Sequence, residues 1–161
     1  MKLKKRLVSP SFLANDPIGV FAIACRCNFE DEAKLAIPYT FSLSIVQSVS
    51  TEHLRIMSSQ TYHRLSKEHA LRREQLLDTV LAVVLPQGCG ACRCTDSLMK
   101  EVRIQMFEKP SLDKDTLERC YSSSVNPQGF PCGTSTSCIT RPGENLKDTL
   151  LSNIMRNVQA L

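Results

Sequence analysis

The densest group of potentially reactive side chains is the segment Cys89-Gly90-Ala91-Cys92-Arg93-Cys94. A C-x2-C turn places two thiolates on one side of a tight bend, where they can occupy two corners of a tetrahedral zinc site. Cys132 and Cys138 are positioned in the sequence to supply the other two corners, with Cys94 and Cys120 in reserve. Four thiolates would close the tetrahedron, so such a zinc would be structural.

Two other interpretations of these cysteines stay open. Because the second pair is spaced C-x5-C, the motif is less specific than two C-x2-C pairs, and all four can equally be reduced loop thiols with no metal. Cys89-Gly90-Ala91-Cys92 also resembles a thioredoxin-type redox turn, with Val80–Leu85 as a strand before it. That chemistry needs a sheet, and the sequence shows no further alternating strand pattern.

The remaining chemistry-bearing residues form no catalytic pattern. His53, His63 and His69 stand in separate helical positions without two-ligand spacing, and we expect them at the surface or half-buried. Cys25 and Cys27 point about 200° apart on a helix, so they are not a natural ligand pair. No G-x-S-x-G, P-loop or paired-carboxylate motif occurs. The sequence predicts a protein that is not an enzyme.

Composition indicates an ordinary globular chain. It has 161 residues, 42% of them apolar, and a net charge of +4. The basic residues are scattered, which does not argue for nucleic acid. The longest apolar run, Val80–Leu85, is far too short to span a membrane, and no apolar stretch of signal-peptide length follows the basic N-terminus. We expect a soluble cytoplasmic or nuclear protein whose cysteines are reduced.

The elements that position these residues are predicted to be helices. Asn15-Asp16-Pro17 starts the first arm of a helical hairpin, apolar on nearly all sides from Ile18 to Cys25, with Phe21 and Ala24 facing the core. Asn28 is expected to cap the second arm, which Pro38 would close.

The rest of the chain follows the same pattern. A short helix is expected from Thr51, then a long amphipathic one from Ser59 to about Leu85, with three more at 96–107, 111–121 and 144–158. The sequence thus predicts an all-α, irregular helical bundle with an N-terminal hairpin, one long central helix and a Cys-containing loop region. The expected divisions are 1–85 for the helical region, 86–142 for the Cys-containing loops and 143–161 for the C-terminal helix.

The first residues carry an expectation of their own. Met1–Val8 reads as the end of a helix whose beginning is missing, with four cationic side chains suited to a helix C-terminus. The chain would then be a fragment. We expect its apolar helix Ile18–Cys25 to be left as an exposed patch that favours self-association.

Two runs of residues resemble a known family. They are Val8-Ser9-Pro10-x-Phe12-Leu13 with Asp16-Pro17-Ile18-x-Val20-Phe21-Ala22-Ile23-Ala24-Cys25, and then Asp31-Glu32-Ala33-Lys34-Leu35-Ala36 with Thr40. This pattern resembles the helical region that follows the BTB/POZ domain in fungal BTB-domain proteins. Unlike those relatives, this chain has no tryptophan and no BTB domain before Met1. The resemblance implies a helical fold and a role in protein–protein interaction, adaptor-like or transcription-related, with ubiquitin-ligase components among the partners.

Overall fold

The computed structural model describes residues 2–84, 94–124 and 146–161, and these residues are helical with short connections. No strand occurs among them, which confirms the all-α prediction. The helices are α1 (Lys2–Leu7), α2 (Pro10–Asn15), α3 (Pro17–Arg26), α4 (Glu30–Thr40), α5 (Ile45–Ser48), α6 (Thr51–Ile56), α7 (Ser59–Val84), α8 (Cys94–Glu108), α9 (Lys114–Ser124) and α10 (Leu146–Gln159). They form two compact units: unit 1, Met1–Arg72 with Glu108–Pro110, and unit 2, Arg73–Phe107 with Ser111–Leu161.

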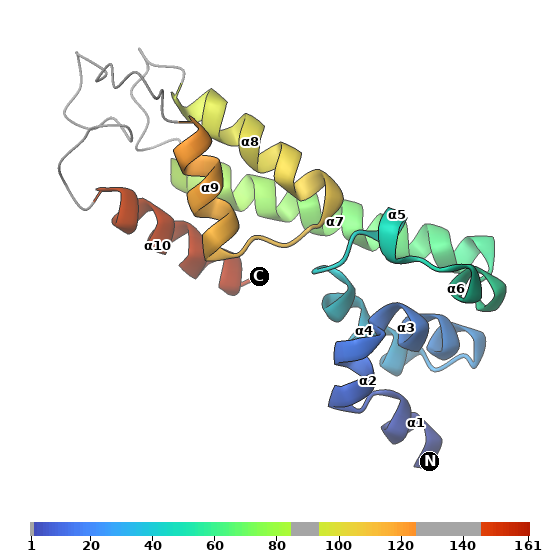
Figure 1. Cartoon of the computed structure of the whole chain (residues 1–161). Helices are drawn as coiled ribbons and strands as arrows, with labels where there is room; N and C mark the ends of the chain where they lie inside the picture. The colour runs from blue at the N-terminus through green and yellow to red at the C-terminus, as the bar shows by residue number, and fades with distance from the viewer. Residues whose placement is uncertain (1, 85–93, 125–145) are drawn as a thin grey trace. The chain divides into compact units, whose positions relative to one another are not determined.

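The helical hairpin of unit 1 consists of α3 and α4, which lie side by side (Figure 1). As predicted, Asp16 caps α3: its Oδ1 accepts the Gly19 N–H at 2.9 Å, and Pro17 occupies the first helical position.

The prediction that Asn28 caps α4 is wrong. Asn28 has φ 55°, and Phe29 stands at the cap position of α4 without a side-chain cap bond. The Asn28 N–H instead donates to Cys25 O at 3.2 Å and the Phe29 N–H to Ala24 O at 2.8 Å. This pair of bonds terminates α3, because an asparagine tolerates the left-handed conformation that a helix C-terminus often requires.

The second arm of the hairpin also runs further than expected. Pro38 lies inside α4, and the helix ends at Thr40 rather than at the proline. The extra turn is held by the Thr40 hydroxyl, which donates to Ile37 O at 2.6 Å and is fully buried. The bond satisfies a carbonyl in the last turn of α4, where the helix has no further backbone N–H to donate to it.

The core of unit 1 is built mainly from α3 and α4. Phe21 and Ala24 are fully buried, as predicted, and Ala33 and Ala36 of α4 are buried with them. The expectation that the apolar segment Ile18–Cys25 forms an exposed patch is wrong, because in unit 1 Ile23 is the one residue of this segment that is exposed, at 39%. Leu7 and Val8 at the end of α1 pack against the same core.

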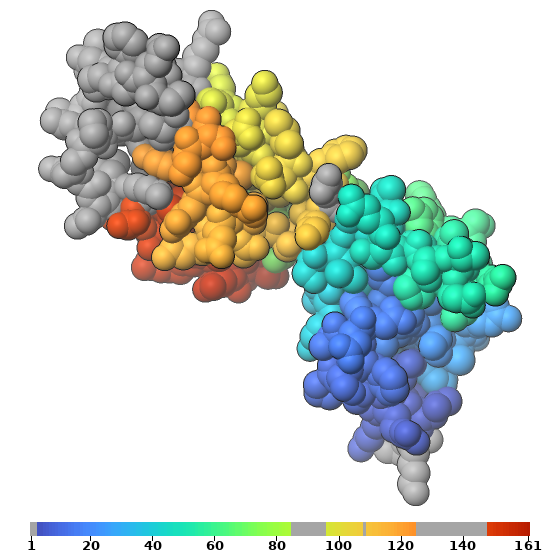
Figure 2. Space-filling model, viewed as in Figure 1, coloured from blue at the N-terminus to red at the C-terminus, as the bar shows by residue number. Residues whose placement is uncertain are grey.

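Two short helices complete the cover of this core. The sequence predicted α6, whereas α5 was not expected. Ile45 of α5 and Met57 after α6 are buried in the same cluster as Phe21. In the space-filling view this cyan-to-green segment lies directly against the blue N-terminal helices (Figure 2).

Unit 2 has an apolar core of its own. The C-terminal half of α7 supplies Leu76, Val80 and Val84, so the strand considered for Val80–Leu85 is a helix as far as Val84. Asp113 starts α9 by accepting the Thr116 N–H at 2.7 Å. The other buried members come from α8, from the segment before α9, from α9 and from α10: Leu98, Met99, Val102, Met106, Leu112, Leu117, Cys120, Tyr121, Leu150, Leu151, Ile154 and Val158.

Candidate functional site

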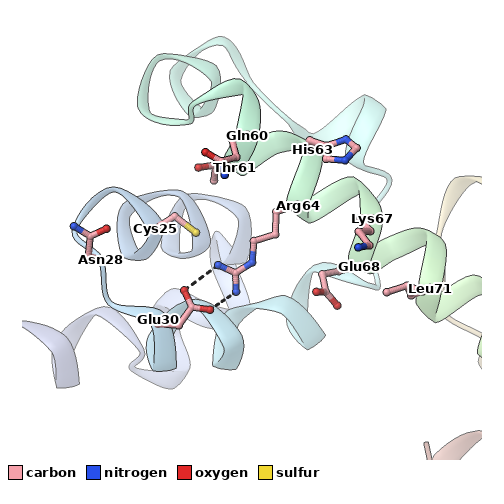
Figure 3. A pocket seen from close by; sticks show the side chains of 10 residues that line it. All are labelled: Cys25, Asn28, Glu30, Gln60, Thr61, His63, Arg64, Lys67, Glu68 and Leu71. Carbon is pink, nitrogen blue, oxygen red and sulfur yellow. Dashed lines mark hydrogen bonds and ion pairs between the residues drawn. The ribbon is translucent and has the colours of Figure 1, made fainter.

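An open groove of about 740 Å³ lies in unit 1 (Figure 3). The end of α3 and the start of α4 form one wall, and the first half of α7 forms the other. The side chains that line the groove are those of Cys25, Asn28, Glu30, Gln60, Thr61, His63, Arg64, Lys67, Glu68 and Leu71. A concave, mixed polar and apolar lining of this kind is where proteins commonly bind a ligand or a peptide.

An ion pair crosses the groove from wall to wall. The two terminal nitrogens of Arg64 donate to the two carboxylate oxygens of Glu30, at 2.9 and 2.5 Å. The Arg64 guanidinium carbon also lies 5.8 Å from the centre of the Phe21 ring, within cation–π range. The hydrogen bonds from Arg64 lower the pKa of the Glu30 carboxyl, and those to Glu30 raise the pKa of Arg64. Both groups therefore stay charged at neutral pH, and the pair fixes the distance between α4 and α7 at this point.

Cys25 contributes a thiol to the groove, on the side that faces Arg64 (Figure 3). Burial raises the pKa of this thiol, and this effect outweighs the opposing influence of Arg64. The thiol therefore stays protonated at neutral pH, whereas a nucleophilic cysteine needs a lowered pKa.

The other lining groups suit hydrogen bonding to a neutral partner. Gln60 and Asn28 present side-chain amides, which can both donate and accept. Lys67 and Glu68 stand next to each other on α7 and balance each other in charge, as Arg64 and Glu30 do. Leu71, 43% exposed, adds an apolar contact at one end.

The cysteines predicted to bind zinc, namely Cys89, Cys92, Cys132 and Cys138, lie outside the described residues. Of the reserve ligands, Cys94 begins α8, and Cys120 is buried in the core of unit 2, where burial raises the pKa of its thiol. Within the described ranges, no three His, Cys, Asp or Glu side chains are grouped in a way that could hold a metal ion.

The three histidines occupy different environments, and the prediction of surface or half-buried positions is wrong for one of them. His63 is exposed and lines the groove, and His53 is partly covered. His69 is buried, with its Nε2 2.8 Å from the Thr40 hydroxyl and its ring edge-on to Phe41. Because the Thr40 hydroxyl donates to Ile37 O, it accepts a hydrogen bond from His69. His69 can therefore be buried because its ring nitrogen has a hydrogen-bond partner, Thr40, which α7 meets only when the chain folds.

Sequence analysis did not single out Glu30 and Arg64 as a pair. They are 34 positions apart, and neither belongs to a motif. Opposite charge was the only available signal, and many other pairs in the chain share it.

Comparison with known proteins gives no family assignment. No family model, no curated protein and no solved structure matches the chain. Among the described helices, none combines the length and the apolar character needed to cross a membrane.

Proposed function

We propose that this chain is a non-enzymatic protein–protein interaction segment of the kind that follows BTB domains, acting in the cytoplasm or nucleus. The observation that carries the proposal is the groove of unit 1, a preformed polar concavity whose walls are joined by the Glu30–Arg64 pair. The residues that carry the BTB resemblance build the α3 wall and the core behind it, including Phe21 and Ala24.

The lining of the groove indicates the kind of partner. Two cations, Arg64 and Lys67, face two anions, Glu30 and Glu68, so the groove has no excess charge to attract a phosphate backbone or a strongly acidic segment. The amides of Asn28 and Gln60 match the alternating donors and acceptors of a peptide backbone. Leu71 offers contact to one apolar side chain. The occupant that fits is therefore a peptide segment of a partner protein that is uncharged where it meets the groove.

Site-specific photo-crosslinking tests this proposal in the full chain. A photoreactive residue replaces Gln60 within the groove, and in a matched control it replaces Glu52, which is 74% exposed on α6 outside the groove. We expect defined protein adducts from position 60 and none of the same adducts from position 52. Each partner is then identified and its affinity for the purified chain is measured.

A second substitution that fills the groove supplies the specificity control. Leu71→Trp places a bulky ring at one end of the groove, and we expect it to abolish the adducts formed from position 60. Adducts that survive Leu71→Trp, or that form equally from position 52, would contradict the use of the groove. An unchanged melting temperature shows that the variant has not simply unfolded.

The family resemblance has a separate test. Determination of the transcript upstream of Met1 is expected to reveal an in-frame segment that encodes a BTB domain. Ubiquitin-ligase components are then the first candidates to compare with the adducts obtained from position 60. An upstream segment encoding an unrelated domain would overturn the family relationship without affecting the groove experiment.

A further inference from the structure

His53 of α6 uses both ring nitrogens. Its Nδ1 lies 3.1 Å from the backbone nitrogen of Ser50, and its Nε2 lies 3.0 Å from Asp16 Oδ1. The His53 side chain is 15% exposed, whereas that of Asp16 is 53% exposed.

Each of these contacts belongs to a helix cap. Ser50 caps α6: its hydroxyl accepts the His53 N–H at 3.2 Å, and the imidazole accepts the Ser50 N–H in return, which forms a capping box. Asp16 caps α3 through the Gly19 N–H. One imidazole therefore joins the N-termini of two helices that are packed against each other.

The contacts define the protonation state of the ring. Because the Ser50 N–H is a donor, Nδ1 must carry a lone pair, and the hydrogen of a neutral imidazole must then be on Nε2, where it is donated to the Asp16 carboxylate. A second proton would go to Nδ1, and the Nδ1–H and the Ser50 N–H would then be two donors facing each other without an acceptor. It would also place a positive charge in the first turn of α6, where the helix dipole disfavours cations.

We propose that His53 is a proton-operated latch that holds the N-terminus of α6 when the ring is neutral and releases it on protonation. Histidine is the side chain that proteins commonly use as a pH-sensitive switch. The Asp16 contact survives the change and becomes an ion pair, so α6 loosens at its start while it stays linked to α3.

The charged groups around His53 are few. Asp16 contacts the ring directly through its Oδ1. Glu52 and Arg55 of α6 are bound to each other at 2.8 Å, and Arg26 at the far end of α3 points to Ile56 O. The neighbouring helix α2 carries no ionisable side chain.

Nuclear magnetic resonance of the full chain tests the latch. Imidazole nitrogen shifts at pH 7.5 should show the Nε2–H tautomer for His53. From pH 7.5 to 5, the amide protection of Leu54 and Met57, whose N–H groups donate to Ser50 O and His53 O, should fall about fivefold after correction for intrinsic exchange rates. The fall should follow the titration of His53.

Two variants separate the latch from general acid effects. His53→Asn keeps an acceptor near the Nδ1 position without a titrating ring, so the protection of α6 should no longer depend on pH. His63→Asn, at an exposed position on α7, should leave the wild-type response intact. An Nδ1–H tautomer at pH 7.5, or a protection of α6 in the wild type that does not follow His53, would overturn the proposal even if His53→Asn failed to fold.

Discussion

Arg64 of α7 binds the Glu30 carboxylate of α4 through both of its terminal nitrogens, although the two residues lie 34 positions apart. The same guanidinium lies over the ring of Phe21, so a residue at the surface is connected to the core of unit 1. This arrangement needs a planar fork, which arginine has and lysine lacks.

Arg64→Lys should therefore lower the stability of unit 1 by about 0.5 to 1 kcal/mol, because the second hydrogen bond is lost and the cation–π contact weakens. Urea unfolding followed by circular dichroism measures the change. Arg55→Lys is the matched control, since the Arg55–Glu52 pair is more than 70% exposed on both sides and should contribute almost nothing. Equal effects from the two variants would contradict this role of Arg64.

Gly19 is required by the close approach of Asp16. A Cβ at Gly19 would overlap Asp16 Oδ2, so alanine must displace the carboxylate that caps α3 and contacts His53. We expect Gly19→Ala to cost about 1 kcal/mol despite the higher helix propensity of alanine. In an Asp16→Ala background the same substitution should stabilise the chain by about 0.5 kcal/mol. Thermal melts of the wild type, Gly19→Ala, Asp16→Ala and the double variant measure these changes in stability. If Gly19→Ala changes the stability with the same sign in both backgrounds, the explanation is refuted.

The contact between α3 and α4 depends on small side chains. Ala24 is fully buried together with Ala33 and Ala36, so Ala24→Glu would bury a charge without a partner and should cost at least about 3 kcal/mol. Ile23→Glu changes the neighbouring residue, which is 39% exposed, and should cost less than about 1 kcal/mol. Chemical denaturation compares the two variants, and coincident wild-type and Ala24→Glu curves would show that the hairpin is not core.

Unit 2 should lose stability in acid through Asp113. The Thr116 N–H that this carboxylate accepts lowers its pKa below the ordinary value of 3.8. The charged cap is therefore fully stabilising above about pH 4, and its contribution disappears as the pH falls through the lowered pKa. Asp113→Ala should cost about 1 kcal/mol at pH 7 and less at pH 2. Asp113→Asn retains a capping oxygen without titrating, so the pH dependence of unfolding between pH 5 and 2 should become shallower in this variant.

Zinc analysis separates the interpretations of the cysteine motif. A structural site formed by Cys89, Cys92, Cys132 and Cys138 predicts about one zinc ion per chain after purification without chelator, with no hydrolytic activity. Reduced thiols without a metal predict less than about 0.2 zinc per chain. Cys92→Ser should remove the metal in the first case, whereas Cys27→Ser, at an exposed position in unit 1, should leave the metal content unchanged.

The sequence determined the features that depend on neighbours along the chain. The cap at Asp16 was predictable because a side-chain oxygen reaches an N–H only three residues away. The amphipathic period of α7 and the apolar character of α3 likewise indicated the helices and the burial of Phe21 and Ala24. Two local roles competed at Asn28. Asparagine is a residue type typical of an N-terminal cap, here that of α4, but it also tolerates a positive φ, and in the structure it terminates α3 instead.

Only the tertiary structure decided which distant polar groups meet. Glu30 with Arg64, Asp16 with His53, and Thr40 with His69 each join residues from different helices, and their sequence surroundings do not distinguish them from exposed polar residues. Such a pair forms because packing of the apolar helix faces fixes the positions of both partners. For Thr40 and His69 the polar contact also satisfies groups that packing has buried. For the same reason the groove of unit 1 and the proposed latch at His53 became visible only in the folded chain.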